Sequence, residues 1–284
     1  MKAYKGFDKD LKCRNFQYEK GKAYEEKDTQ ICKTGFHACE NPLEVFRYYP
    51  PCDGHRYCEV EQSGTLSKSG DSFRVTSTKI KINNEIGLEG LIQAVINKSG
   101  ESESYSINTG NHTVVENVES YSIALNKSYG SVAANTGDYS LTTTIRGSSI
   151  AANTGSCSAA VNRGYHSIAA NAGERSVAIG GNDDSVAVNI GNRSTAINNG
   201  DQSVALNMGG HAEALVTKEG SIAIATGIQS KAKGALGSAI VLVERTTWNG
   251  RVYSLNNIKA AIVDGEKIKA DTWYTLRNGE FVEV

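Results

Sequence analysis

The sequence predicts a mainly β protein built around a parallel β-solenoid of nonapeptide repeats, with a small α+β domain before it and an antiparallel β cap after it. Two observations carry this prediction. From Ser104 to about Leu236 the chain repeats every nine residues, in fifteen units that keep one register without an insertion. A short period held over so many units is typical of solenoids, in which each unit stacks on its neighbours. The segments on either side lack this period.

Each repeat unit reads Ser-Val-Ala-x-Asn-x-Gly-x-x, so five residues suited to a strand precede four suited to a turn. One unit should form one side of a coil, with the Gly at the seventh place in a conformation of positive φ. Two units per coil would give a rod about 36 Å long, and three would give about 24 Å. The period is compatible with both.

Two faces of the repeat differ in composition. The first, third and fifth residues share one face of an extended unit, and the second and fourth share the other. The third residue is Ala in 12 of 15 units and the fifth is Asn in 10. We favour a thin interior of Ser, Ala and stacked Asn amides, because a tight steric limit explains this sameness. The alternative, with Val and Ile inside, would bury more apolar area.

In the favoured arrangement, the second and fourth residues form an outward apolar stripe that needs a partner. We expect it to bind a protein partner or to hold copies of the chain together as a dimer or trimer. The charged residues Glu213, Lys231 and Lys233 should end this surface near the last coils. The predicted interface residues are Val132, Ile150, Ile168, Val177, Val186, Val188, Ile197, Val204 and Leu206.

The chain divides into four predicted segments. Residues 1–83 form the α+β domain, with a short helix that Asn41 caps and Pro42 begins, and with strands near 56–61 and 73–82. Residues 84–103 hold an amphipathic helix that could cover the open end of the solenoid. Residues 104–238 are the solenoid, and residues 239–284 the cap. Tight turns are expected at 264–265 and 278–279 of the cap.

Composition limits the classes of function. The net charge of −1 gives no indication of nucleic acid binding. No apolar run reaches the roughly 18 residues of a transmembrane helix, and the first residues do not resemble a signal peptide. We therefore expect no membrane partner and a location in the cytoplasm of a bacterial host, with the virion as an alternative. Five of the six Cys precede residue 60, and we expect reduced thiols there.

Candidate chemistry is confined to the N-terminal segment. Cys13, Cys32, His37 and Cys39 could bind zinc, but they lack the paired Cys-x-x-Cys spacing of strong zinc sites, so free thiols and no cofactor are the favoured interpretation. A second group, Arg14, Gln17, His37 and Glu59, could serve a small transferase or metal-dependent activity. No phosphate-binding glycine loop or nucleophile motif accompanies these residues.

The first sixty residues, including Ile31-Cys-Lys-Thr-Gly-Phe-His-Ala-Cys-Glu-Asn-Pro, resemble an uncharacterised domain family common in phages and prophages of gut bacteria. Members often join this domain to Asn-Thr-Gly-rich repeats. The resemblance implies a viral or mobile-element origin and brings no activity with it. We therefore expect a non-enzymatic interaction protein of phage origin whose solenoid binds a host macromolecule, with inhibition of bacterial defence as one role it could serve.

The repeats Ser176-Val-Ala-Ile-Gly and Ser221-Ile-Ala-Ile-Ala-Thr-Gly are also similar to the head repeats of trimeric autotransporter adhesins. That similarity implies a left-handed β-roll assembled as a trimer. The period of nine departs from the roughly seven of those repeats, which puts adhesin function in doubt. A trimeric fibre or adhesin-like component is the alternative function from a structural class.

Overall fold

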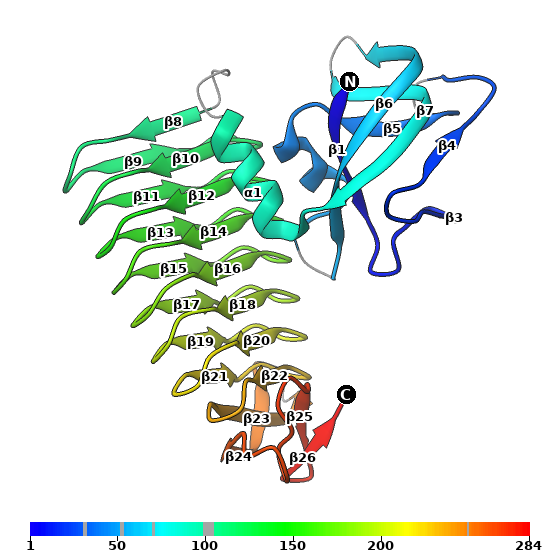
Figure 1. Cartoon of the computed structure of the whole chain (residues 1–284). Coiled ribbons are helices and arrows are strands. Elements are labelled where there is room, and N and C mark those ends of the chain that lie inside the picture. Colours follow the sequence, from blue (N-terminus) through cyan, green and yellow to red (C-terminus); the bar gives the residue numbers. More distant parts are fainter. Residues whose placement is uncertain (31–32, 52–53, 70–71, 99–104, 249) are drawn as a thin grey trace. The chain divides into compact units, whose positions relative to one another are not determined.

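The computed structural model describes residues 1–284 except 31–32, 52–53, 70–71, 99–104 and 249 (Figure 1). The chain divides into two compact units, Met1–Glu103 and Ser104–Val284. Both are built mainly from strands, and the second is a parallel β-solenoid with an antiparallel C-terminal sheet, which confirms the predicted fold class. None of the described helices is long and apolar enough to cross a membrane.

The N-terminal unit contains a small closed sheet. Strand β1 pairs antiparallel with β5 and β6, and β7 pairs antiparallel with β5 and β6, so four strands close into a ring. Strand β4 adds to the edge of β7. Ala3, Phe7, Val60 and Ile82 pack together in the interior. The strands are β1 Lys2–Phe7, β2 Lys12–Cys13, β3 Phe16–Gln17, β4 Ala23–Glu25, β5 Phe36–Cys39, β6 Arg56–Ser69 and β7 Ser72–Glu85.

Two helices complete this unit. The 3-10 helix η1 (Pro42–Arg47) begins where predicted, because Asn41 Oδ1 accepts a hydrogen bond from the backbone N–H of Leu43 at 3.0 Å. The helix α1 (Gly87–Lys98) packs against β6 and η1. Its residues Leu91, Ile92 and Val95 are fully buried.

The solenoid has two repeat units per coil. Each strand pairs in parallel with the strands two places before and after it, so that Val186 lies beside Ile168 and Val204, which are 18 residues away on either side. The even-numbered strands form one sheet and the odd-numbered strands the other, here called the even sheet and the odd sheet. Figure 1 shows these coils stacked in order. Of the two coil sizes that the period allowed, the smaller is therefore present.

The bounds of the solenoid strands follow the repeat. They are β8 Tyr105–Asn108, β9 Val114–Asn117, β10 Ile123–Asn126, β11 Val132–Asn135, β12 Leu141–Thr144, β13 Ile150–Asn153, β14 Ala159–Asn162, β15 Ile168–Asn171, β16 Val177–Gly180, β17 Val186–Asn189, β18 Thr195–Asn198, β19 Val204–Asn207, β20 Glu213–Val216, β21 Ile222–Ala225 and β22 Lys231–Gly234.

The interior of the solenoid is thin and lined by small side chains, as predicted. The third-place alanines form a column with no exposed surface, for example Ala187, Ala205 and Ala223. The first-place serines and fifth-place asparagines are also buried, whereas second- and fourth-place residues of the odd sheet are partly or fully exposed. Val and Ile therefore face outward.

Hydrogen bonds to the backbone satisfy most of this polar interior, with Thr144 Oγ1 as an exception that has no partner among the described residues. Asn162 shows the pattern: its Oδ1 accepts from the N–H of Gly164 at 2.7 Å, and its Nδ2 donates to the carbonyl of Ser149 at 2.8 Å. The serine hydroxyls connect neighbouring coils, since Ser203 Oγ accepts from the N–H of Ser185 at 3.1 Å. The Asn amides thus bond to the backbone of the turns and of adjacent segments, whereas we expected them to stack on one another in a ladder.

The role predicted for the seventh-place glycine is wrong. Positive φ occurs at the ninth place, where Arg175 and Arg193 have φ of 55° and 54°. The seventh-place glycines have another reason to lack a side chain. A Cβ on Gly173 would lie 1.9 Å from the carbonyl oxygen of Gly155, one coil earlier, and a Cβ on Gly191 would lie 1.9 Å from that of Gly173. The turns stack too closely for a methyl group.

The C-terminal segment continues both sheets of the solenoid. Strand β23 (Ala239–Trp248) pairs in parallel with β21 and antiparallel with β24 (Tyr253–Ile262), at the end of the odd sheet. Strand β25 (Tyr274–Arg277) pairs antiparallel with β22 and with β26 (Glu280–Glu283), at the end of the even sheet. Asn278 and Gly279 both have positive φ, which confirms a tight turn there.

The adjacent glycines Gly209 and Gly210 offer a matched test of the turn stacking. We expect Gly209→Ala to lower the free energy of unfolding by about 3 kcal/mol, because its Cβ would lie 2.0 Å from the carbonyl oxygen of Gly191. Gly210→Ala should cost less than about 1 kcal/mol, since its Cβ would first meet the Ile228 side chain at 3.0 Å. Denaturant unfolding followed by circular dichroism measures both. Equal losses in the two variants would contradict this explanation.

Candidate functional site

The outer surface of the odd sheet is apolar over nine strands. Because the side chains of a strand alternate, the second and fourth places of each unit point outward. The sixth place, just after each repeat strand, is partly or fully exposed as well, so three rows cross the sheet. We call these rows the apolar face. The first row is Val114, Val132, Ile150, Ile168, Val186, Val204, Ile222, Ala239 and Ile262; the second is Glu116, Ala134, Ala152, Ala170, Val188, Leu206, Ile224, Val241 and Ala260; the third is Val118, Thr136, Thr154, Ala172, Ile190, Met208, Thr226, Val243 and Ile258.

This face is open and almost uncharged. Glu116, near its first coil, is the one ionisable residue among the positions of the apolar face. Ile168 is 39% exposed, Met208 48% and Ile262 67%. A contiguous apolar surface of this extent matches the largest patch of an ordinary monomer, and such patches are often interaction sites.

Most of the predicted interface residues lie together on the apolar face. They are Val132, Ile150, Ile168, Val186, Val188, Val204 and Leu206. The other two, Val177 on β16 and Ile197 on β18, lie on the even sheet. Val177 is buried, so its prediction as an exposed interface residue is wrong. Consecutive repeat units alternate between the two sheets. The second- and fourth-place residues of the repeat therefore form two separate surfaces, one on each sheet.

The expectation that charge ends the stripe near the last coils is wrong for the apolar face. Glu213 and Lys231 lie on β20 and β22 of the even sheet, where their side chains form an ion pair at 3.0 Å. Lys233 is on the same sheet. The apolar face continues past these coils to Ile258 and Ile262 of β24.

A second candidate site is a cavity of about 940 Å³ in the N-terminal unit. Two of the four predicted polar residues, Arg14 and His37, line it together with Lys5, Tyr48 and Tyr49. The lining comes from β1, the β2–β3 hairpin, the segment between β4 and β5, β5 itself, and the end of η1 with the residues after it. Residues distant in sequence thus meet at one wall.

The other two predicted polar residues have structural roles elsewhere. The Gln17 amide donates to the backbone carbonyls of Asp10 and Tyr18, both at 2.9 Å. Glu59 forms an ion pair with Lys2 at 2.7 Å. Sequence reasoning missed Lys5, although its place between Ala3 and Phe7 puts a charged side chain on the inward side of β1.

Lys5 is 95% buried (5% exposed) and holds a central position in the cavity wall. Its Nζ donates to the carbonyl of His37 at 2.7 Å and lies 3.6 Å from Cys13 Sγ. Burial lowers the pKa of His37, and the positive charges of Lys5, Arg14 and Arg74 lower it further, despite the hydrogen bond between His37 Nδ1 and the Gly35 carbonyl. The wall therefore has a positive potential.

Comparison with known families concerns this unit. Residues 1–94 match the model of DUF7666, a domain of unknown function. The matched residues end within α1, so the DUF7666 match covers the closed sheet and its helices and leaves the solenoid outside. Neither the curated proteins nor the solved structures gave a match to the chain.

The cysteines of residues 1–94 do not share one site in the described part of the chain. Burial raises the pKa of Cys39 and of Cys58 to about 12, so both are protonated at neutral pH. Within the described residues, no three His, Cys, Asp or Glu side chains gather as metal ligands. Cys32 lies outside the described residues, so the zinc hypothesis stays a prediction.

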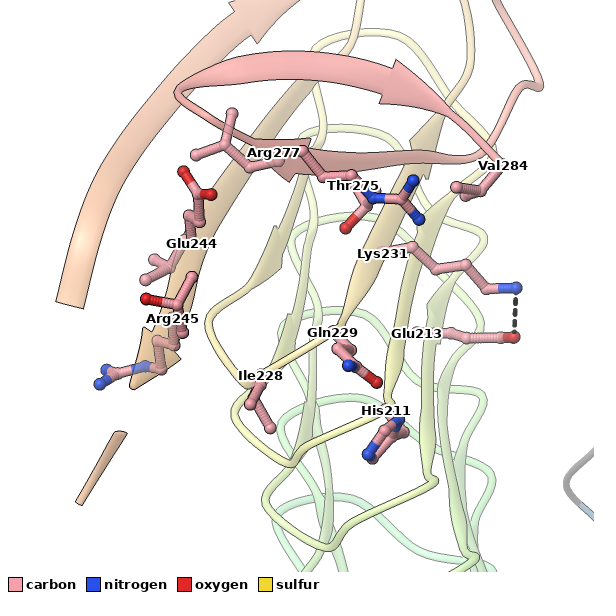
Figure 2. A pocket seen from close by; sticks show the side chains of 13 residues that line it. His211, Glu213, Ile228, Gln229, Lys231, Glu244, Arg245, Thr275, Arg277 and Val284 are labelled. Carbon is pink, nitrogen blue, oxygen red and sulfur yellow. Dashed lines mark ion pairs between the residues drawn. The ribbon is translucent and has the colours of Figure 1, made fainter. Parts of the chain in front are cut away.

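A third cavity, of about 750 Å³, lies where the C-terminal strands meet the last coils (Figure 2). His211, Gln229 and the Glu213–Lys231 ion pair come from the solenoid side, and Thr275 and Arg277 from β25. The charges of Glu213 and Lys231 offset each other, so nothing in this pair selects the charge of a ligand.

Glu244, at the edge of this cavity, joins the two C-terminal hairpins. Its carboxylate accepts from Asn257 Nδ2 on β24 at 2.6 Å and from the N–H groups of Asn278 and Gly279 in the β25–β26 turn at 2.7 and 2.9 Å. These donors hold the pKa of Glu244 below its usual value. The ionised carboxylate is thus part of the folded cap.

We expect Glu244→Gln to lower the melting temperature at pH 7. The NH₂ group of the glutamine amide would face N–H donors that now bond to a carboxylate oxygen. A depressed carboxyl pKa contributes stability that is present above the unfolded value of about 4.3 and is lost as the pH falls through the lower folded value. The difference from wild type should therefore shrink below about pH 4. The exposed Glu266→Gln, in the same segment, is the control and should differ little from wild type at either pH.

Proposed function

We propose that this chain is a non-enzymatic interaction protein in which the solenoid presents the apolar face to another protein surface. The observation that supports the proposal is the near absence of charge from the outward positions of the odd sheet, although these side chains are exposed. An uncharged apolar surface gains stability when a partner removes it from water. The thin interior contributes the rigidity that such a surface requires.

The apolar face has the area of a small protein interface. Nine strands at a spacing of about 4.8 Å extend roughly 38 Å, and the three rows span about 13 Å along the strands. A face of this size buries on the order of 500 Å² on each partner, or about 1,000 Å² in total. That area reaches the lower bound expected of a specific protein interface.

The partner we propose is a second copy of the chain. In the N-terminal half of the face, the second row has Glu116 on the first strand and then Ala134, Ala152 and Ala170, which form a trough beside the larger first row. From the middle strand onward the same row continues with Val188, Leu206, Ile224 and Val241 and is raised, and Ala260 ends it. A two-fold axis near the middle strand would place the raised half of each copy in the trough of the other.

A phage origin and a cytoplasmic location are also part of the proposed function. We propose a phage or prophage origin, supported by the resemblance of the first sixty residues to domains common in such genomes. The protein would then act in the cytoplasm of its bacterial host. A host protein of antiviral defence is the alternative occupant of the apolar face.

The proposed dimer predicts that Val186→Lys dissociates it. Val186 lies on the middle strand of the nine, so the two introduced ammonium groups would meet near the two-fold axis in an apolar interface. The dissociation constant of the dimer should rise at least about a hundredfold. Light scattering on the full chain measures the mass, which should change from twice the 30.4 kDa chain mass to the chain mass.

Thr195→Lys is the matched control, because it changes the same place of the next strand, β18, on the even sheet. Its mass should remain that of the wild type. A wild-type chain that stays monomeric at tens of micromolar, or a dimer that survives Val186→Lys, would refute self-association. A monomer that captures one host protein, and loses it in Val186→Lys, would put that protein in place of the second copy.

A further inference from the structure

The N-terminal cavity contains a buried cation without a counter-charge. The partners of Lys5 Nζ are the His37 carbonyl, Cys13 Sγ, and the rings of Phe7 and Tyr18 at 5.4 and 5.5 Å. Among the described residues, none of the carboxylates lies within ion-pair distance of Lys5. A buried ammonium group is costly unless negative charge accompanies it. The contacts orient this cation and leave its charge uncompensated.

The donors of Lys5 are not all used. An ammonium group has three N–H donors, and the described contacts of Lys5 include two acceptors, one of them a weakly accepting sulfur. Because Lys5 also lines the cavity, the remaining donor can reach a ligand there. A group that is both anionic and hydrogen-bonding would satisfy this site.

The surroundings of Lys5 favour an anion. Arg14 and Arg47 line the same cavity, and Glu26 is the one carboxylate that the described part of the lining contributes. The lowered pKa of His37 has Lys5, Arg14 and Arg74 among its causes, after burial. The cations that line the cavity therefore give this wall a positive potential, in keeping with the lowered pKa of His37.

Exposed aromatic rings lie beside these cations. Phe16 and Tyr48 both line the cavity, yet they are 45% and 39% exposed. A ring in such a position can stack on a flat base, which contributes affinity with little dependence on the base. The cavity volume of about 940 Å³ is within the range of small-molecule sites.

We propose that this cavity binds a nucleoside phosphate, with the phosphate at Lys5 and Arg14 and the base against the exposed rings of Phe16 and Tyr48. The buried cation recognises the charge of the ligand, and the rings recognise its planar part. This site is independent of the apolar face, so the oligomeric state of the chain does not decide it.

The test is calorimetric titration of the full chain with AMP, ADP, GMP and UMP, and with inorganic pyrophosphate and adenosine as ligands that each lack one part. We expect at least one nucleotide to bind at least about tenfold more tightly than pyrophosphate, and adenosine to bind weakly. Arg14→Gln should weaken nucleotide binding at least about tenfold, since charge-assisted bonds to phosphate are lost. Lys5→Met should abolish it.

Arg14 is exposed, so Arg14→Gln tests the site even where Lys5→Met disturbs folding. Lys22→Met, an exposed lysine paired with Glu19, is the control for a lost positive charge elsewhere in the unit. A bound phosphate should also raise the pKa of His37, which ring-proton NMR detects. No binding by any nucleotide, or equal loss in Lys22→Met and Arg14→Gln, would overturn the proposal. Equal binding of pyrophosphate and nucleotides would overturn the role of the rings.

Discussion

The close stacking of turns is the constraint on which the solenoid depends. Where the carbonyl of Gly155 lies under Gly173, and that of Gly173 under Gly191, no side chain fits between successive turns. Strands joined by such turns enclose a narrow interior in which the third-place side chains are as small as Ala, as the fully buried Ala187 and Ala205 show. Larger apolar residues must then face outward. The composition of the repeat follows from this spacing.

A thin interior also determines how polar groups are satisfied. Ser and Asn occupy buried positions because each reaches backbone groups that the turn leaves unpaired, as Asn162 does with Gly164 and Ser149. An unpaired buried polar group costs about 1–3 kcal/mol, so these bonds are necessary for the coil to close. The N-terminal unit buries its apolar and aromatic residues in the ordinary way, and it also buries the charged side chain of Lys5. The solenoid thus buries small and polar side chains and exposes larger apolar ones on the odd sheet, whereas the N-terminal unit buries its large apolar side chains.

The nine-residue period predicted the solenoid, its interior and its strands, because each of these depends on contacts between units of known spacing. It did not predict which residues share an outer surface. That depends on the number of units per coil, and with two units Val186 and Ile197 lie on opposite sheets although both belong to the sequence stripe. The N-terminal cavity was less predictable. Arg14 and His37 are 23 positions apart, and only the closure of the sheet brings them to Lys5.

The architecture alone does not account for the apolar face. A thin solenoid must put its second and fourth residues outside, but it tolerates charge there, as Glu213, Lys231 and Lys233 show at the same places of the even sheet. The even sheet is also apolar at these places from Ile123 to Ile197, except at Thr143 and Thr195, but many of its side chains there are buried. The odd sheet keeps apolar side chains at the same places from Val132 to Ile262, and these are partly or fully exposed. Exposed apolar side chains in this number contribute little to the coil itself, and contact with another surface would remove them from water.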